Sequence, residues 1–303
     1  MSDAAMPLAS PPPSNKAAVF ARRLSSTLAL WAVLIAAILT ENRWLCFGLI
    51  ALIGGAALVE WRRMFAVALP GAWAAWLYLI SAGYAVALFL CGSEKSVVAP
   101  GLPETLAIPI LLLGLFLLSM RRPLQGRETL WRVFSATFGF LYIPLLLAFV
   151  WRLLQFPGDT GQGRLPGVFY MLYVVAVTKF TDMGAYFFGM LLGRHKMIPT
   201  ISPGKTWEGF AGGFAGAFFA SHLVVVLWPQ KVPLLNHSHA AVLAVLLALV
   251  TVTADLAESV IKRCLGVKDS GRFLPGIGGA LDLIDSVLFT APLAWAYLKI
   301  VAA

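Results

Sequence analysis

Long apolar runs separated by short polar segments make up the chain from residue 24 to its end. Each run is close to the roughly 20 residues that cross the hydrocarbon core of a bilayer as an α-helix. Within a run the apolar residues form a continuous block instead of one stripe at helical spacing, which is typical of membrane spans. We predict nine spans, near residues 24–40, 44–60, 72–91, 103–119, 133–151, 167–191, 208–228, 239–258 and 280–300.

This pattern predicts an all-α, polytopic integral membrane protein with about nine transmembrane helices. Residues 1–24 are rich in Ala, Ser, Pro and Asn, which predicts a disordered cytoplasmic tail, and 25–303 form a single transmembrane domain. The first five spans hold almost no ionisable residue in mid-helix. We therefore expect 25–152 to be scaffold helices and 167–300 to carry the active-site motifs. Pro109 and Pro144 lie inside spans and are expected to kink them.

The composition excludes a soluble domain of ordinary make-up. Hydrophobic residues account for 60% of the chain and charged residues for 12%, with a mean hydropathy of +0.84. A soluble domain is about 25% charged. Cys46, Cys91 and Cys264 have no paired spacing, so they predict neither a disulfide framework nor a zinc site.

The positive charge of the chain predicts its orientation. A net charge of +9 would suggest nucleic acid in a soluble protein, but here the cations lie in loops between spans, so we expect no nucleic-acid partner. With the N-terminus inside, sixteen of the 23 Lys and Arg residues fall in cytoplasmic segments, six fall outside, and Lys179 lies in a span. By the positive-inside rule, the N-terminus and the polar motifs face the cytoplasm from the cell inner (plasma) membrane.

Two ionisable residues lie in the middle of the sixth span. Lys179 and Asp182 are three residues apart and share one face of the helix. A buried ion pair that only orders the helix bundle is one interpretation. The other is that Asp182 faces an aqueous cavity, which is the usual meaning of an ionisable residue within a membrane.

The segment between the sixth and seventh spans reads ISPGKTWEG from Ile201 to Gly209. It is not a phosphate-binding P-loop, because that motif requires glycine at position 199, where Pro199 stands, and no strand is predicted before it. A Ser-Pro-Gly turn at the mouth of the seventh span remains. Its backbone N–H groups and Lys205 could hold an anion, or the turn could be an ordinary one with a lysine that reaches the interface.

The most polar stretch runs from residue 253 to 285, between the last two spans. Asp255, Glu258, Ser259 and Lys262 have the spacing of one helix face. A glycine-rich segment follows, with Lys268 and Asp269, and then Asp282 and Asp285 open the ninth span. Two helix ends therefore bring acidic faces together beside several cations.

Converging carboxylates suit Mg²⁺, and the neighbouring cations suit phosphate oxygens. Such an arrangement is typical of a phosphoryl or nucleotidyl transfer site, in which positioning and charge neutralisation supply most of the rate. The alternative is a set of interfacial charges that pair with lipid headgroups or with one another.

These residues resemble the motif of the phosphatidate cytidylyltransferase (CDP-diacylglycerol synthase) family. The resemblance covers about the C-terminal 110 residues and is carried by S-x2-KR-x4-KD-x-G-x2-LP-x2-GG-x2-D-x2-D from Ser259 to Asp285. Asp182-x-Gly-Ala-Tyr186 and the segment Ser202–Gly209 are also similar to that family. The chain departs from the family pattern at Ile277, Ala280 and Leu283, where the family usually has His, an aliphatic residue and Arg.

The resemblance implies that CTP and phosphatidic acid react to CDP-diacylglycerol and diphosphate in phospholipid biosynthesis. It also implies Mg²⁺, room for a monovalent cation such as K⁺, contact with membrane lipids, and a homodimer. By this resemblance the catalytic residues are Lys262, Arg263, Lys268 and Asp269: the three cations hold phosphates, and Asp269 either orients Lys268 or binds cytidine or the metal through water. The substrate-binding residues are Asp182, Ser202, Lys205 and Ser259, and the metal ligands are Asp255, Asp282 and Asp285.

Two other functions stay open from the sequence. A secondary transporter would explain ionisable residues in mid-span and the Gly and Pro breaks, but not the clustering of charge at one face. A CTP-dependent polyprenol kinase could share a similar fold. The pattern of the CDP-alcohol phosphotransferases is missing from the chain.

Overall fold

The structure is a computed structural model that describes residues 36, 40, 42–91, 99, 101–121, 123, 125–157, 165–271 and 278–303. In these ranges eight helical runs are long and apolar enough to cross a membrane. They are α2 (Arg43–Met64), α3 (Gly71–Cys91), α4 (Leu102–Met120), the continuous run α5 (Arg127–Phe140), η1 (Leu141–Leu145) and α6 (Leu146–Leu154), α7 (Val168–Leu192), α8 (Trp207–Leu227), α9 (His237–Cys264) and α10 (Ala280–Ala302).

The eight runs coincide with the last eight predicted spans, and the predicted all-α fold of a polytopic integral membrane protein is confirmed. The predicted tail, 1–24, lies outside the described residues, and so does the first predicted span, 24–40, apart from residues 36 and 40. A short 3₁₀ helix, η2 (Pro229–Lys231), connects α8 to α9.

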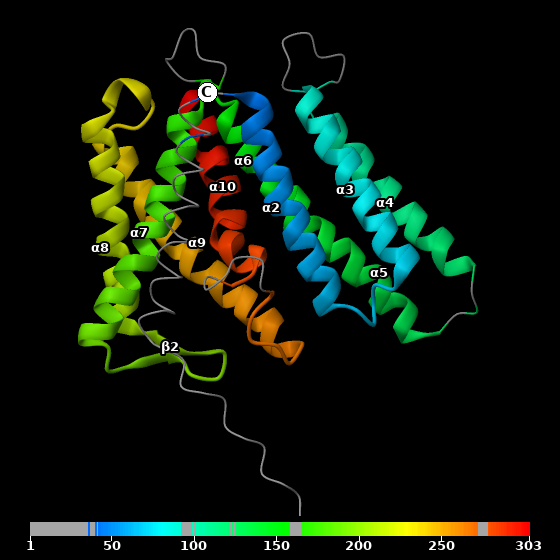
Figure 1. Cartoon of the computed structure of the whole chain (residues 1–303). Coiled ribbons are helices and arrows are strands. Elements are labelled where there is room, and N and C mark those ends of the chain that lie inside the picture. Colours follow the sequence, from blue (N-terminus) through cyan, green and yellow to red (C-terminus); the bar gives the residue numbers. More distant parts are fainter. Residues whose placement is uncertain are drawn as a thin grey trace, which may run out of the picture.

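The helices form two groups joined by α2 and α6. Figure 1 shows α7, α8, α9 and α10 together on one side and α3, α4 and α5 on the other. Helix α10 packs against α2, α6, α7 and α9, so it lies at the centre of the bundle. This central place matters because the start of α10 carries two of the acidic residues singled out in the sequence.

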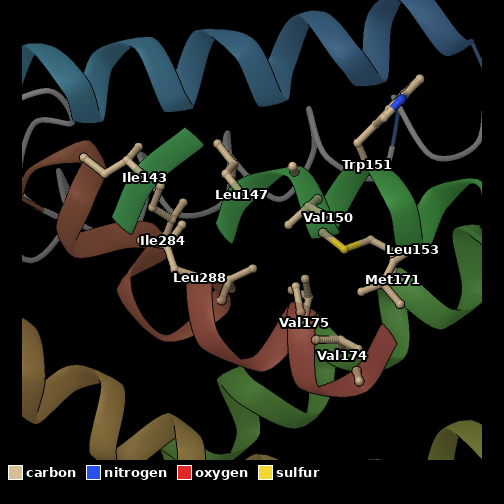
Figure 2. Packing of buried hydrophobic residues seen from close by; sticks show 14 of the residues in the cluster. Ile143, Leu147, Val150, Trp151, Leu153, Met171, Val174, Val175, Ile284 and Leu288 are labelled. Atoms are coloured by element: carbon tan, nitrogen blue, oxygen red, sulfur yellow. The ribbon is translucent and has the colours of Figure 1, made fainter. Parts of the chain in front are cut away.

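The apolar core extends through the whole bundle, and Figure 2 shows the part of it where η1, α6, α7 and α10 meet. Lipid tails are as apolar as these side chains, so the stabilisation comes from close packing more than from removal of water. Residues of this part of the core include Ile143, Leu147, Val150, Val174, Val175, Ile284 and Leu288.

The two prolines inside spans lie in different settings. Pro144 lies in η1, a π-helical turn between α5 and α6. Proline lacks the N–H that an α-helix needs, and a single π-helical turn is a common way to accommodate such a local irregularity. Pro109 lies within α4, which runs as one helix from Leu102 to Met120.

A small hairpin follows α7. Strand β1 (Lys196–Ile198) pairs antiparallel with β2 (Ser202–Thr206). The sequence predicted a turn at Ser202-Pro-Gly and no strand, and this was wrong: the turn lies at residues 199–201, and Ser202–Thr206 is extended. The hairpin is fastened to α8, because Thr206 Oγ1 accepts from Gly209 N at 3.1 Å and Glu208 accepts from the backbone N of Arg194 at 3.1 Å.

Glycines bring α7 and α8 into very close contact. A Cβ on Gly216 of α8 would run into the carbonyl oxygen of Phe180, and a Cβ on Gly184 of α7 would run into that of Gly212. Small residues at such positions let two backbones approach, which favours association of helices inside a membrane. This contact holds the hairpin at the end of α7.

We predict that Gly216→Ala lowers the free energy of unfolding by about 1–3 kcal/mol, because the added methyl group meets backbone that cannot move aside. Gly83→Ala on α3 is the matched control, since nothing lies within 4 Å of its added Cβ. Thermal unfolding in detergent measures both. Equal melting temperatures for the two variants would contradict the close α7–α8 packing.

Candidate active site

A cavity of about 600 Å³ opens among α7, β2, α8, α9 and α10. Its lining includes β2 of the hairpin and the first residues of α10, and both elements are labelled in Figure 1. Its charged lining consists of Lys179, Asp182, Lys205, Asp255, Glu258, Lys262, Asp282 and Asp285.

Three carboxylates from α9 and α10 converge in this cavity. One oxygen each from Asp255, Glu258 and Asp285 lies within 4.8 Å of the others. Asp255 and Glu258 are three residues apart on α9 and therefore share a face. Glu258 and Asp285 are buried, and Glu258 Oε1 has no hydrogen-bond partner among the described residues. Buried polar atoms nearly always have a partner, so this oxygen is available to bind a cation or a water molecule.

Lys262 connects the two helices. Its Nζ lies 2.6 Å from Glu258 Oε2 and 2.7 Å from Asp282 Oδ1. The other oxygen of Asp282 accepts from the backbone N of Gly279 at 2.7 Å and of Ser270 at 3.3 Å. Asp282 thus orients Lys262 and the start of α10. The third carboxylate of the group is that of Glu258, and not that of Asp282 as the sequence predicted.

Two further lysines lie against acids of the cavity. Lys205 Nζ is 3.0 Å from Asp255 Oδ2 and donates to the carbonyl of Val252 at 3.1 Å. Lys179 Nζ is 3.7 Å from Asp182 Oδ2. The lysine from the hairpin therefore reaches across the cavity to α9, and the pair on α7 faces the same space.

The structure brings most of the predicted site residues together. Seven of them line the cavity: Asp182, Ser202, Lys205, Asp255, Lys262, Asp282 and Asp285. Ser259 lies beside them, with its Oγ 3.5 Å from Asp255 Oδ1.

Three predicted residues lie elsewhere. Arg263, Lys268 and Asp269 are exposed and lie outside the cavity lining. Arg263 donates to the carbonyls of Ile201 at 3.4 Å and Val267 at 3.3 Å, so it joins the hairpin to the segment after α9. The departure at Ile277 lies outside the described residues.

The sequence interpretation placed Glu258 on the acidic face of α9 but did not name it among the metal ligands. The signal was present, because Glu258 lies three residues after Asp255 on the same helix face. From the sequence, an ion pair with Lys262, four residues further on, was the simpler role for Glu258 than a place in the metal site. The structure contains both: Oε2 meets Lys262, and one oxygen of the Glu258 carboxylate lies within 4.8 Å of an oxygen of Asp255 and of Asp285.

The charge balance of the cavity limits what it can bind. Five carboxylates and three lysines line it, an excess of two negative charges. Anions would be repelled from such a site unless a cation joined it. Carboxylate oxygens are the ligands that Mg²⁺ prefers, usually together with substrate phosphates. The three grouped carboxylates fit a divalent cation, and the lysines fit phosphate oxygens.

The chain is similar to known proteins over most of its length. Residues 21–301 match the family model of the cytidylyltransferase family. An uncharacterized protein of Escherichia coli, YnbB, is 32% identical over 274 residues, which cover 89% of this chain and 85% of that protein.

Two phosphatidate cytidylyltransferases are also similar. That of Mycobacterium bovis is 39% identical over 168 residues, or 55% of this chain and 51% of that protein. That of Staphylococcus epidermidis is 44% identical over 133 residues, or 44% of this chain and 50% of that protein. These alignments span about half the length of the relatives that carry this name. The match to the family model extends over nearly the whole sequence, and the chain belongs to the cytidylyltransferase family.

Proposed function

We propose that this protein is a phosphatidate cytidylyltransferase, which converts CTP and phosphatidic acid into CDP-diacylglycerol and diphosphate. The observation that carries the proposal is the cavity of a membrane bundle that is lined by three lysines and five carboxylates, three of which are grouped. Membership of the cytidylyltransferase family supports the choice of nucleotide.

The reaction needs no nucleophile from the protein. A phosphate oxygen of phosphatidic acid bonds to the α-phosphorus of CTP, and the bond from that phosphorus to the bridging oxygen of the β-phosphate breaks. The attacking phosphate is already anionic, so no proton must be removed. The task of the chain is to hold two anions next to each other in line, which accounts for a large part of the rate in such reactions.

Lysines of the cavity would offset the repulsion between the substrates. Lys205 and Lys262 each lie within 3.0 Å of a carboxylate, and both side chains are mostly buried. Ammonium groups held in this way bind phosphate oxygens through charge-assisted hydrogen bonds. Asp182 and Ser202 complete the wall as predicted substrate-binding residues, while Arg263, Lys268 and Asp269 stay predictions outside the cavity lining.

Asp255, Glu258 and Asp285 would hold a divalent cation such as Mg²⁺. When bound, it would neutralise charge on the phosphate oxygens in the transition state. The unpartnered Oε1 of Glu258 supports this assignment. Asp282 stays a predicted ligand, although its contacts favour a role in orienting Lys262. A monovalent cation such as K⁺ stays a prediction from the family resemblance.

Phosphatidic acid would reach the cavity sideways from the bilayer. Tyr186 and Met190 line the cavity and are largely exposed on α7, so one wall faces the lipid. We infer that this end faces the cytoplasm, where CTP is found, because cations are in excess in the loops on this side. The inner membrane as location and a homodimer as assembly belong to the same proposal.

Purified protein in detergent, given CTP, phosphatidic acid and Mg²⁺, should release diphosphate and form CDP-diacylglycerol. Chelation of the divalent cation should abolish both. Omission of phosphatidic acid, or its replacement by a polyprenol, is the control. The proposal would be contradicted if the reaction with phosphatidic acid released no diphosphate and the reaction with a polyprenol formed prenyl phosphate. This result would favour a polyprenol kinase.

Glu258→Gln should lower the turnover by at least the 10- to 100-fold that loss of a metal-supporting group typically costs. The amide keeps the size of the side chain but removes its charge. Glu128→Gln is the matched control, because that glutamate is exposed on α5 and only faces Arg132. The activity of both variants is measured over a series of Mg²⁺ concentrations. Wild-type turnover by Glu258→Gln would remove this residue from the metal site.

A further inference from the structure

Glu60 is a buried acid outside the cavity. It lies near the end of α2, among the helices predicted to be scaffold, and its relative exposure is 2%. The other acidic residues that are buried in the described ranges, Glu258 and Asp285, both line the cavity. Burial of a carboxyl group costs free energy because it loses its hydrogen bonds to water, so hydrogen bonds within the protein must replace them.

The start of α10 supplies these hydrogen bonds. The backbone N–H of Ala280 donates to Glu60 Oε1 at 2.9 Å, and that of Leu281 donates to Oε2 at 3.0 Å. The first N–H groups of a helix have no partner within it, and the helix dipole favours a negative charge there. The hydroxyl of Ser270 also donates to Oε2 at 3.0 Å. Glu60 therefore caps α10 from about 220 residues away in sequence.

Two glycines allow the carboxylate to fit. A Cβ on Gly271 would run into the Glu60 carboxylate, and a Cβ on Gly279 would meet both Glu60 Oε2 and Ser270 Oγ. The backbone on both sides of the turn is therefore in direct contact with this one side chain. Close approach of this kind requires residues without a side chain.

Glu60 and Asp282 hold the same two pieces of backbone. Asp282 accepts from the N–H groups of Ser270 and Gly279, and Glu60 accepts from the hydroxyl of Ser270 and from the next two N–H groups after Gly279. Asp282 in turn binds Lys262, which binds Glu258. Asp285 lies one turn further along α10.

We propose that Glu60 is a positioning residue: it fixes the start of α10, so that Asp285 and, through Asp282 and Lys262, Glu258 stand where they hold the divalent cation. This inference rests on the proposed function for its metal site. It assigns to α2 a part in the geometry of the active site, although Glu60 is not among the residues that line the cavity.

The test is the affinity of the full-length protein for Mn²⁺, measured by electron paramagnetic resonance in detergent without substrates. Glu60→Gln keeps the volume and one acceptor oxygen but replaces the other with a donor. The backbone N–H of either Ala280 or Leu281 then loses its acceptor, depending on which oxygen is replaced. We expect the affinity for Mn²⁺ to fall about tenfold, as for other groups that support metal ligands.

Glu104→Gln is the matched control. Glu104 is a partly buried acid at the other end of the bundle, where it contacts Arg152 and accepts from Tyr84 at 3.0 Å. The Glu104→Gln substitution should lower the thermal stability of the protein and leave its affinity for Mn²⁺ unchanged. Equal affinities for Glu60→Gln and the wild type, or an equal loss in both variants, would overturn the inference.

Ser270→Ala gives a second, milder variant in case Glu60→Gln does not fold. It removes one hydrogen bond to Glu60 and should weaken Mn²⁺ binding in the same direction; unchanged affinity there would overturn the inference. The outcome is separate from the proposed function, because a protein that binds Mn²⁺ but forms no CDP-diacylglycerol refutes only the proposed reaction. A wild type that binds no Mn²⁺ refutes the metal site, and the role of Glu60 with it.

Discussion

The repulsion between three carboxylates at the ends of α9 and α10 is the constraint on which the active end depends. Two like charges about 4 Å apart repel by about 4 kcal/mol at an effective dielectric constant of 20. One oxygen each of Asp255, Glu258 and Asp285 lies within 4.8 Å of the others, so the repulsion between ionised groups is of this order, and Glu258 and Asp285 are buried. Cations beside the carboxylates offset this repulsion when the three groups are ionised. Lys205 and Lys262 supply part of the counter-charge, and a divalent cation with its substrates would supply the rest.

Contacts elsewhere in the bundle hold the carboxylates and lysines of the cavity in position. The close α7–α8 packing places the hairpin so that Lys205 reaches Asp255. Arg263 fastens the same hairpin to the segment after α9. Helix α2 closes the arrangement from the other side, because Glu60 caps α10. The division into scaffold helices, 25–152, and motif-bearing helices, 167–300, stays a prediction. Glu60 and the start of α10 form a contact between these two parts of the chain.

Features that depend on neighbouring residues could be predicted from the sequence. The spans follow from apolar blocks, and the convergence of Asp255 with Asp285 follows from helical spacing at two helix ends. Features that depend on distant contacts could not. No local pattern distinguishes Glu60 from an interfacial acid, since its partners are the backbone N–H groups of Ala280 and Leu281. The hairpin was missed because Ser-Pro-Gly favours turns, whereas pairing with β1 decides its conformation.

The most direct test of the central claim is the position of Mn²⁺, which takes the same oxygen ligands as Mg²⁺, in anomalous diffraction from crystals of the protein. The account predicts the strongest anomalous peak between the carboxylates of Asp255, Glu258 and Asp285. A protein that binds Mn²⁺ only elsewhere, with no peak beside Glu258, would contradict it.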